Sequence, residues 1–221
     1  MNQEMVTQAI KKHKVVAILR GIERESVEPV IDALYEGGIR LLEITFNQKS
    51  LSKLQDTAAA ISYAKKRYGN SMYVGAGTVM SVEEVICAEN AGASFILSPN
   101  VNERVLRAAV ERNMCAVPGA MTPTEIVTAY EAGAAFVKLF PAGNMGLAYC
   151  KAVMAPINHI PLMAVGGIGL DNLRDYLCAG FESVGVGSSL TCREMIRNKE
   201  YSRLSSLAAE YMQAATAKKN L

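Results

Sequence analysis

The sequence has few of the residues that build metal centres and disulfide frameworks. Its two histidines, His13 and His159, lie far apart, so a histidine-based metal site is not expected. Its five cysteines are odd in number and widely spaced, and none forms a CxxC pair, which argues against a zinc site and a disulfide framework. Cysteines used in this way are typical of small core residues in a reducing compartment. We therefore expect a cytoplasmic protein that holds no metal.

Long apolar runs and an excess of one charge are also missing. No hydrophobic stretch approaches the roughly 20 residues that span a bilayer, and residues 1–14 lack the apolar core and cleavage site of a signal peptide. The net charge is only +2, and no basic tract is present, which argues against a nucleic-acid partner. We expect no membrane and no nucleic acid, and residues 1–14 predict a short amphipathic helix.

What the chain does contain is a regular alternation of strand-like and helical stretches. Half of its 221 residues are hydrophobic, so a sizeable core is available. Short apolar runs recur at intervals averaging about 24 residues, the length of a βα unit with short loops. They begin near Val15, Leu41, Met72, Phe95, Cys115, Phe136, Leu162 and Ser183.

Eight such units predict an α/β fold, a (β/α)8 TIM barrel with an additional N-terminal helix. No linker or low-complexity segment divides the chain, so we predict a single domain over residues 1–221. An open doubly wound sheet is the alternative, but residues 19–23 (LRGIE) lack its GxGxxG motif. Ser26 and Ser81 stand before predicted helices, and Ser81 with Glu84 has the spacing of a capping box.

Polar residues follow almost every predicted strand at its carboxyl end, where barrels place their chemistry. Such convergence is harder to explain by packing than any single residue, and it predicts an enzyme. The residues concerned are Arg20, Glu43, Thr45, Asn47, Thr78, Ser98, Asn100, Lys138, Gly166, Gly167, Ser188 and Ser189.

Lys138 is the first candidate for catalysis. In the run AAFVKLFPAG (residues 134–143) it shares one strand face with Phe136 and Phe140. Burial among phenylalanines lowers the pKa of an ammonium group, and a neutral lysine is a better nucleophile toward a carbonyl. The alternative is that Lys138 reaches solvent from the strand end or pairs with a carboxylate.

Glu43 is the second candidate, because it lies in an otherwise apolar strand on the same face as Leu41 and Thr45. An unpaired buried carboxylate is costly, so Glu43 must point into a wet or paired site. Its strand stands opposite that of Lys138 across the barrel, and the two would supply a general base and a nucleophile. The alternative is a structural Lys–Glu ion pair.

Two glycine-rich motifs, VGGIG (165–169) and GVGSS (185–189), follow the seventh and eighth strands. Glycine lets a backbone approach an anion, and a serine adds a hydroxyl donor. Barrels hold phosphate at this place, although tight turns also need glycine. The motifs predict a phosphate-bearing substrate bound by Gly166, Gly167, Gly187 and Ser188.

Two further residues, Arg20 and Thr78, are candidates for polar contacts with the substrate. Arg20 ends the first strand, where a guanidinium fits a carboxylate or phosphate, unless it is an ordinary surface arginine. Thr78 ends the GAGT motif and offers a hydroxyl contact, unless it is only a turn residue.

The motifs AILRG, EITFN, GAGTV, SPN, PGAMTPTE, VKLFPA and VGGI occur in order over most of the chain. Together they resemble the 2-keto-3-deoxy-6-phosphogluconate (KDPG) / 4-hydroxy-2-oxoglutarate (KHG) aldolases, class I pyruvate aldolases built on a (β/α)8 barrel. The resemblance implies that Lys138 forms the Schiff base and that Glu43 transfers protons. It also implies a homotrimer without metal or other cofactor. By the same match the pyruvate end is lined by Arg20, Thr78, Pro99 and Phe140.

The implied reaction is reversible cleavage of KDPG to pyruvate and glyceraldehyde 3-phosphate, with KHG cleavage to pyruvate and glyoxylate as a second activity. Asn47 and Val165, also expected to contact substrate, stand where the gluconate-type pattern has arginine and threonine. The related 6-phosphogalactonate (KDPGal) aldolases are more similar at both positions. The alternatives are a KDPGal aldolase, a phosphate-sugar epimerase or isomerase with Glu43 as base, and a non-catalytic sugar-phosphate sensor.

Overall fold

The computed structural model describes residues 2–217, and its strands are all parallel. Eight of the nine strands begin within one residue of the start that the sequence predicts, and the two-residue strand Gly119–Ala120 was not predicted separately. The strands are β1 (Val15–Leu19), β2 (Leu41–Thr45), β3 (Tyr73–Gly77), β4 (Phe95–Leu97), β5 (Cys115–Val117), β6 (Gly119–Ala120), β7 (Val137–Leu139), β8 (Leu162–Val165) and β9 (Ser183–Val186).

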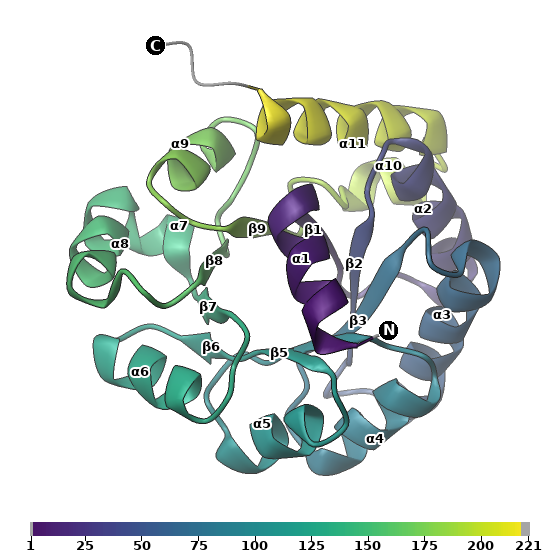
Figure 1. Cartoon of the computed structure of the whole chain (residues 1–221). Helices are drawn as coiled ribbons and strands as arrows, with labels where there is room; N and C mark the ends of the chain where they lie inside the picture. The colour runs from purple at the N-terminus through teal and green to yellow at the C-terminus, as the bar shows by residue number, and fades with distance from the viewer. Residues whose placement is uncertain (1, 218–221) are drawn as a thin grey trace.

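The fifth barrel strand is split in two at Pro118, which has no N–H to donate to a ladder. Its first half, β5, pairs with β4, and its second half, β6, pairs with β7. The strand order β5-β4-β3-β2-β1-β9-β8-β7-β6 therefore begins and ends on the same strand, and the sheet closes into a barrel (Figure 1). The predicted (β/α)8 architecture is confirmed, and the open doubly wound sheet is excluded.

Helices surround the barrel as an outer layer (Figure 1), and within residues 2–217 no helix is long and apolar enough to cross a membrane. The helices are α1 (Gln3–His13), α2 (Arg24–Glu36), α3 (Lys53–Tyr68), α4 (Val82–Asn90), α5 (Glu103–Val110), α6 (Pro123–Glu131), α7 (Ala142–Met145), α8 (Leu147–Met154), α9 (Leu173–Cys178), α10 (Arg193–Arg197) and α11 (Tyr201–Thr216), with a 3-10 turn η1 (Ala155–Ile157).

The sequence predicts helices that begin after Ser26 and after Ser81, and the structure confirms only the second. The capping box at α4 is confirmed: Glu84 N donates to Ser81 Oγ at 3.2 Å, and Ser81 N donates to the Glu84 carboxylate at 3.3 Å. The start at Ser26 is wrong, because α2 begins at Arg24 and Ser26 lies in its first turn. There the Ser26 N–H already donates to Glu23 O at 2.9 Å, so the helical turn closes before Ser26.

Helix α1, which the sequence predicts, covers the amino end of the barrel. Figure 1 shows it lying across the end of the ring of strands. Its Val6, Ala9 and Ile10 are buried in one cluster with residues that point into the lumen, among them Phe95 and Phe136. Because α1 occupies the amino end, the carboxyl ends of the strands form the open mouth.

The side chains inside the barrel are arranged in layers because strand residues alternate between the two faces of the sheet. Leu41 and Phe136 belong to the apolar lumen cluster. Glu43 lies two residues after Leu41 in β2, and Lys138 lies two residues after Phe136, which directly precedes β7. Alternation therefore places both on the lumen side and one layer closer to the mouth.

Candidate active site

Lys138 is buried at the centre of the barrel mouth, with only 3% of its surface exposed. Its strand β7 is paired on both sides, with Gly119 and Met163 as the neighbours in register. Nζ lies 4.7 Å from the centroid of the Phe140 ring. Burial lowers the pKa of Lys138, the charge of Glu43 opposes this shift, and Arg20 adds to it. A larger share of neutral amine is therefore available for attack on a carbonyl.

Glu43 is fully buried, and neither of its carboxylate oxygens has a hydrogen-bond partner within the described residues. Gly77 makes room for it, because a Cβ at Gly77 would lie 1.7 Å from Glu43 Oε1. Burial raises the pKa of Glu43, while Lys138 and Arg20 oppose the rise. A carboxyl group with a raised pKa is suited to both accept and return a proton.

Glu43 and Lys138 influence each other without being paired. Each charge shifts the pKa of the other, yet the ion pairs formed among residues 2–217 do not include one between them. The structural ion pair that the sequence left open is therefore absent here. Neither group is held by the other. Lys138 lines the cavity at the barrel mouth, whereas Glu43 is fully buried and is not among the residues that line it.

A cavity of about 640 Å³ opens at this mouth. It brings residues from β1, β7, β8 and the loop after β9 to one place, with apolar groups beside Lys138 and glycines further out. Of the residues predicted from the sequence, it is lined by Arg20, Lys138, Phe140, Val165, Gly166, Gly167, Gly187 and Ser188.

Two features require glycine in the loop after β8: the backbone conformation and the close packing of neighbouring atoms. Gly166 and Gly167 have φ values of 88° and 72°, which favour glycine. A Cβ on Gly166 would lie 3.0 Å from the Phe140 ring, and one on Gly143 would lie 2.3 Å from Gly167 O. These glycines therefore let the loops after β7 and β8 meet at the cavity surface.

Arg20 and Thr78 meet across the mouth. Arg20 Nη2 donates to Thr78 Oγ1 at 3.3 Å, which links the ends of β1 and β3. Thr78 has a positive φ of 56°, uncommon for a threonine, and Gln48 Nε2 donates to its carbonyl oxygen at 2.9 Å. The Thr78 hydroxyl thus accepts a hydrogen bond from Arg20, and its contact with the substrate stays a prediction.

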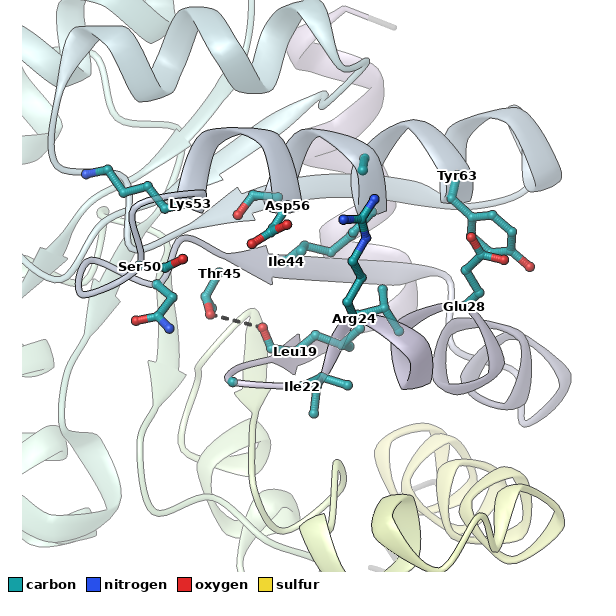
Figure 2. A pocket seen from close by; sticks show the side chains of 16 residues that line it. Leu19, Ile22, Arg24, Glu28, Ile44, Thr45, Ser50, Lys53, Asp56 and Tyr63 are labelled. Carbon is teal, nitrogen blue, oxygen red and sulfur yellow. Dashed lines mark hydrogen bonds between the residues drawn. The ribbon is translucent and has the colours of Figure 1, made fainter.

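Four of the predicted catalytic and substrate-binding residues do not line the main cavity: Glu43, which is fully buried, Thr78, which contacts Arg20 of the lining, and also Pro99 and Asn47. Pro99 packs against the fifth strand, since a Cβ on Gly119 would lie 2.5 Å from Pro99 O. Asn47 lines a second cavity of about 220 Å³ outside the barrel, and its Oδ1 accepts from Lys49 N at 3.2 Å. Figure 2 shows that second cavity, between α2 and α3, with the Arg24 side chain extending into it. Neither Pro99 nor Asn47 lines the cavity that holds Lys138.

The comparison with protein families now bears on this geometry. The family model described as "KDPG and KHG aldolase" matches residues 6–207. The chain belongs to this aldolase family. It is therefore an aldolase, a carbon–carbon lyase, and the epimerase, isomerase and sensor alternatives are not supported.

Relatives of this aldolase carry names from both branches of the family. A "2-dehydro-3-deoxy-6-phosphogalactonate aldolase" of Escherichia coli is 36% identical over 180 residues, covering 81% of this chain and 85% of the relative. A "2-dehydro-3-deoxy-phosphogluconate aldolase" of Dickeya dadantii is 32% identical over 204 residues, 92% of each chain. A KDPG aldolase structure from Legionella pneumophila, "with pyruvate captured at low pH as a covalent carbinolamine intermediate", is 26% identical, with a TM-score of 0.81 over 92% of this chain and 96% of that one.

Several residues of the aldolase cavity do not stand out in the sequence. Asn172 holds the loop after β8, because its Nδ2 donates to Gly167 O at 2.9 Å and its Oδ1 accepts from Gly169 N at 3.0 Å. The sequence marks these cavity residues only by their position just after the two glycine motifs. The cavity is also lined by Asp171, Asn172, Thr191 and Arg193, which the sequence did not indicate, and by Ser189 of the second glycine motif.

A buried network behind Thr78 was also not predicted. Glu84 is only 1% exposed, and its carboxylate accepts from Lys53 Nζ at 2.7 Å, Gln48 Nε2 at 2.8 Å and Met80 N at 2.5 Å. Lys53 and Gln48 lie 31 and 36 residues from Glu84 in the chain, a separation that no local pattern reveals. As for metal ligands, no group of three His, Cys, Asp or Glu residues within 2–217 is placed to hold an ion.

Proposed function

We propose that this aldolase cleaves a phosphorylated 2-keto-3-deoxy acid into pyruvate and glyceraldehyde 3-phosphate through a Schiff base on Lys138. The observation that carries the proposal is a buried lysine with a lowered pKa, facing the cavity at the barrel mouth beside the unpartnered carboxylate of Glu43. The carbinolamine captured in the Legionella relative supports the same covalent chemistry.

In the first stage, the neutral amine of Lys138 adds to the C2 ketone and gives a carbinolamine. Loss of water then leaves an iminium cation. Glu43, with its raised pKa, donates its proton to the hydroxyl that leaves as water, and it is left as the carboxylate that the second stage needs. Burial of Lys138 keeps a share of the amine unprotonated, so the attack needs no strongly alkaline medium.

In the second stage, Glu43 removes the C4 hydroxyl proton, directly or through a water. The C3–C4 bond breaks, its electrons pass into the iminium to form an enamine, and glyceraldehyde 3-phosphate leaves. Protonation of the enamine at C3 restores the iminium, and hydrolysis releases pyruvate and free Lys138. KHG gives pyruvate and glyoxylate by the same steps.

The two ends of the substrate need different environments. Arg20, held by Thr78, is suited to the C1 carboxylate, and Phe140 and Val165, which line the cavity, offer apolar contact to the pyruvate carbons. The phosphate fits the loops after β8 and β9, where exposed backbone and a hydroxyl can donate hydrogen bonds. Its proposed ligands are Gly166, Gly167, Gly187 and Ser188.

The C4 configuration is the open choice between KDPG and KDPGal. The family resemblance as a whole implies KDPG, but Val165, an apolar residue in the cavity lining, supports KDPGal. Asn47 in place of arginine and the 36% identical Escherichia coli relative support it too. A kinetic comparison of the two C4 epimers tests this, and we expect the larger kcat/KM for KDPGal.

Borohydride trapping tests the proposal as a whole. With pyruvate present, reduction should attach the three-carbon unit irreversibly to Lys138 and abolish activity, and mass spectrometry of the digest identifies the site. Lys138→Ala should bind no adduct and turn over no substrate while its circular dichroism stays that of the wild type. Absence of an adduct on Lys138 in the wild type, or activity in Lys138→Ala, would overturn the Schiff-base mechanism.

We also infer a homotrimer in the cytoplasm, as the family resemblance implies. The described structure has exposed apolar side chains on loops that follow the strands, such as Leu51, Met80 and Met121, and these are suited to subunit contacts. Sedimentation equilibrium tests the assembly, with three chains of 23.8 kDa expected per particle. Cell fractionation tests the compartment.

A further inference from the structure

Arg193 is a cation of the active-site cavity that the sequence did not indicate. It is the first residue of α10, the helix that follows the last barrel strand, β9. It lines the cavity that holds Lys138, together with the glycine loop after β8 and with Gly187 and Ser188. The guanidinium therefore belongs to the side of the mouth where the phosphate is proposed to bind.

The Arg193 guanidinium has no partner within the described residues. It takes part in no hydrogen bond or ion pair there, whereas other exposed arginines, such as Arg67 and Arg203, pair with carboxylates. Its Nη2 lies beside Gly21, where a Cβ would be 3.4 Å away. Gly21 follows Arg20, so Arg193 extends from α10 toward the loop after β1.

The phosphate side of the cavity is otherwise short of positive charge. Backbone N–H groups and the Ser188 hydroxyl are neutral donors, and Asp171, whose carboxylate would repel an anion, lines the same cavity. A phosphate group near pH 7 carries a charge of about −1.5 to −2. An arginine presents parallel N–H donors that match phosphate oxygens and keeps its charge at any physiological pH.

Arg20 and Arg193 are placed for different ends of the substrate. Arg20 shifts the pKa of both Lys138 and Glu43, so it lies near the carbon that Lys138 attacks, which is bonded to the carboxylate. Arg193 is not among the charges that shift the pKa of either group. Because it lies on α10, in the outer layer of helices (Figure 1), with its Nη2 beside Gly21, it is the cation at the rim of the mouth, as the phosphate on C6 requires.

We propose that Arg193 binds the phosphate of the substrate and makes this aldolase selective for phosphorylated keto acids. The inference rests on the proposed function, because it requires a phosphorylated substrate. A second consequence follows from charge: Asp171→Asn should improve binding of the phosphorylated substrate, since it removes a negative charge from the cavity lining.

The decisive experiment compares two substrates with three variants. The substrates are the phosphorylated 2-keto-3-deoxy acid and KHG, which has no phosphate. Arg193→Gln removes the charge, Arg193→Lys keeps it without the planar fork, and Arg197→Gln is the matched control. Arg197 lies on the same helix and lines a neighbouring cavity beside Glu23 and Ile196. Arg193 borders both cavities, whereas Arg197 does not line the one that holds Lys138.

In Arg193→Gln we expect kcat/KM for the phosphorylated substrate to fall about 10- to 100-fold, mainly through KM, as for loss of a charged hydrogen bond. The value for KHG should change less than about twofold, Arg193→Lys should recover part of the loss, and Arg197→Gln should match the wild type.

An unchanged kcat/KM for the phosphorylated substrate in Arg193→Gln would overturn the assignment. Equal losses for both substrates would overturn it as well, because they would place Arg193 at the carboxylate or in the fold. Borohydride trapping of the wild type with pyruvate separates these results from the proposed function. If no Lys138 adduct forms, the proposed function fails and the Arg193 assignment fails with it; if the adduct forms, the kinetics test Arg193 alone.

Discussion

The reactivity of Lys138 depends on its burial and on the balance of two neighbouring charges, Glu43 and Arg20. Adduct formation with pyruvate needs the neutral amine, so its rate rises with pH through the pKa of Lys138 and then levels off. Because that pKa is lowered, the plateau should begin at a lower pH than for an ordinary lysine.

Glu43→Gln should move this plateau to a still lower pH. The carboxylate charge of Glu43 raises the pKa of Lys138, so its removal lowers that pKa further. The measurement is the initial rate of borohydride-trapped adduct with pyruvate as a function of pH. A shift toward higher pH would show that the charge of Glu43 does not act on Lys138 in this way.

Arg20→Met should move the plateau in the opposite direction. The positive charge of Arg20 lowers the pKa of Lys138, so its loss lets the pKa rise and the plateau begin at higher pH. Weaker pyruvate binding is expected in the same variant, which makes the position of the plateau, and not its height, the quantity to compare. Shifts of the same sign in Arg20→Met and Glu43→Gln would contradict this electrostatic picture.

Gly77→Ala should impair proton transfer by Glu43 and leave adduct formation by Lys138 largely intact. The added Cβ would occupy the position of Glu43 Oε1, so the side chain of Glu43 must move. Overpacking of this kind costs about 1–3 kcal/mol of stability, and kcat should fall much more steeply than adduct formation with pyruvate. Wild-type kcat in a folded Gly77→Ala enzyme would show that the position of Glu43 is not critical.

At the scale of whole elements, α4 and the loop between β2 and α3 are joined through Glu84. Burial alone would raise the pKa of this carboxyl, but hydrogen bonds from Lys53, Met80 N and Gln48 outweigh burial and lower it. A lowered pKa in the folded state means stability that is present above the ordinary glutamate range and lost as the pH falls through the folded pKa.

Glu84→Ala should therefore lower the free energy of unfolding at neutral pH by about 1–3 kcal/mol, from loss of the helix cap and of buried hydrogen bonds. Glu84→Gln should weaken the dependence of stability on acid pH. Urea denaturation at several pH values measures both effects, and the adjacent, exposed Glu83→Ala is the control. Equal losses in Glu83→Ala and Glu84→Ala would mean that the network contributes nothing beyond helix propensity.

The elements differ in how far sequence could predict them. Strand starts were readable because buried parallel strands are short apolar runs, and the Ser81–Glu84 box because its partners are three residues apart. Lys138 and Glu43 stood out as charges in such runs. The split at Pro118 and the network around Glu84 depend on contacts between segments far apart in sequence. So do the position of Asn47 outside the main cavity and the orientation of Arg193 toward Gly21, and no residue pattern encodes these contacts.

At the scale of the molecule, the barrel separates a stabilising end from a reactive end. Helix α1 fills the amino end with Val6, Ala9 and Ile10, which join the lumen cluster, while Lys138 faces the carboxyl end. Residues at the amino face of such barrels contribute mainly to stability. The layers of side chains between the two ends are close-packed and keep α1 out of contact with the substrate cavity.

Ile10→Ala should consequently reduce stability and leave catalysis intact. Truncating this fully buried side chain should cost about 2–5 kcal/mol, measured by urea denaturation. The kcat and KM of the folded enzyme and the pH profile of Lys138 adduct formation should equal those of the wild type. Met5→Ala, on the same helix but half exposed, is the control and should change neither property. A changed pH profile in folded Ile10→Ala would show instead that packing at the amino end is transmitted through the lumen layers to the lysine.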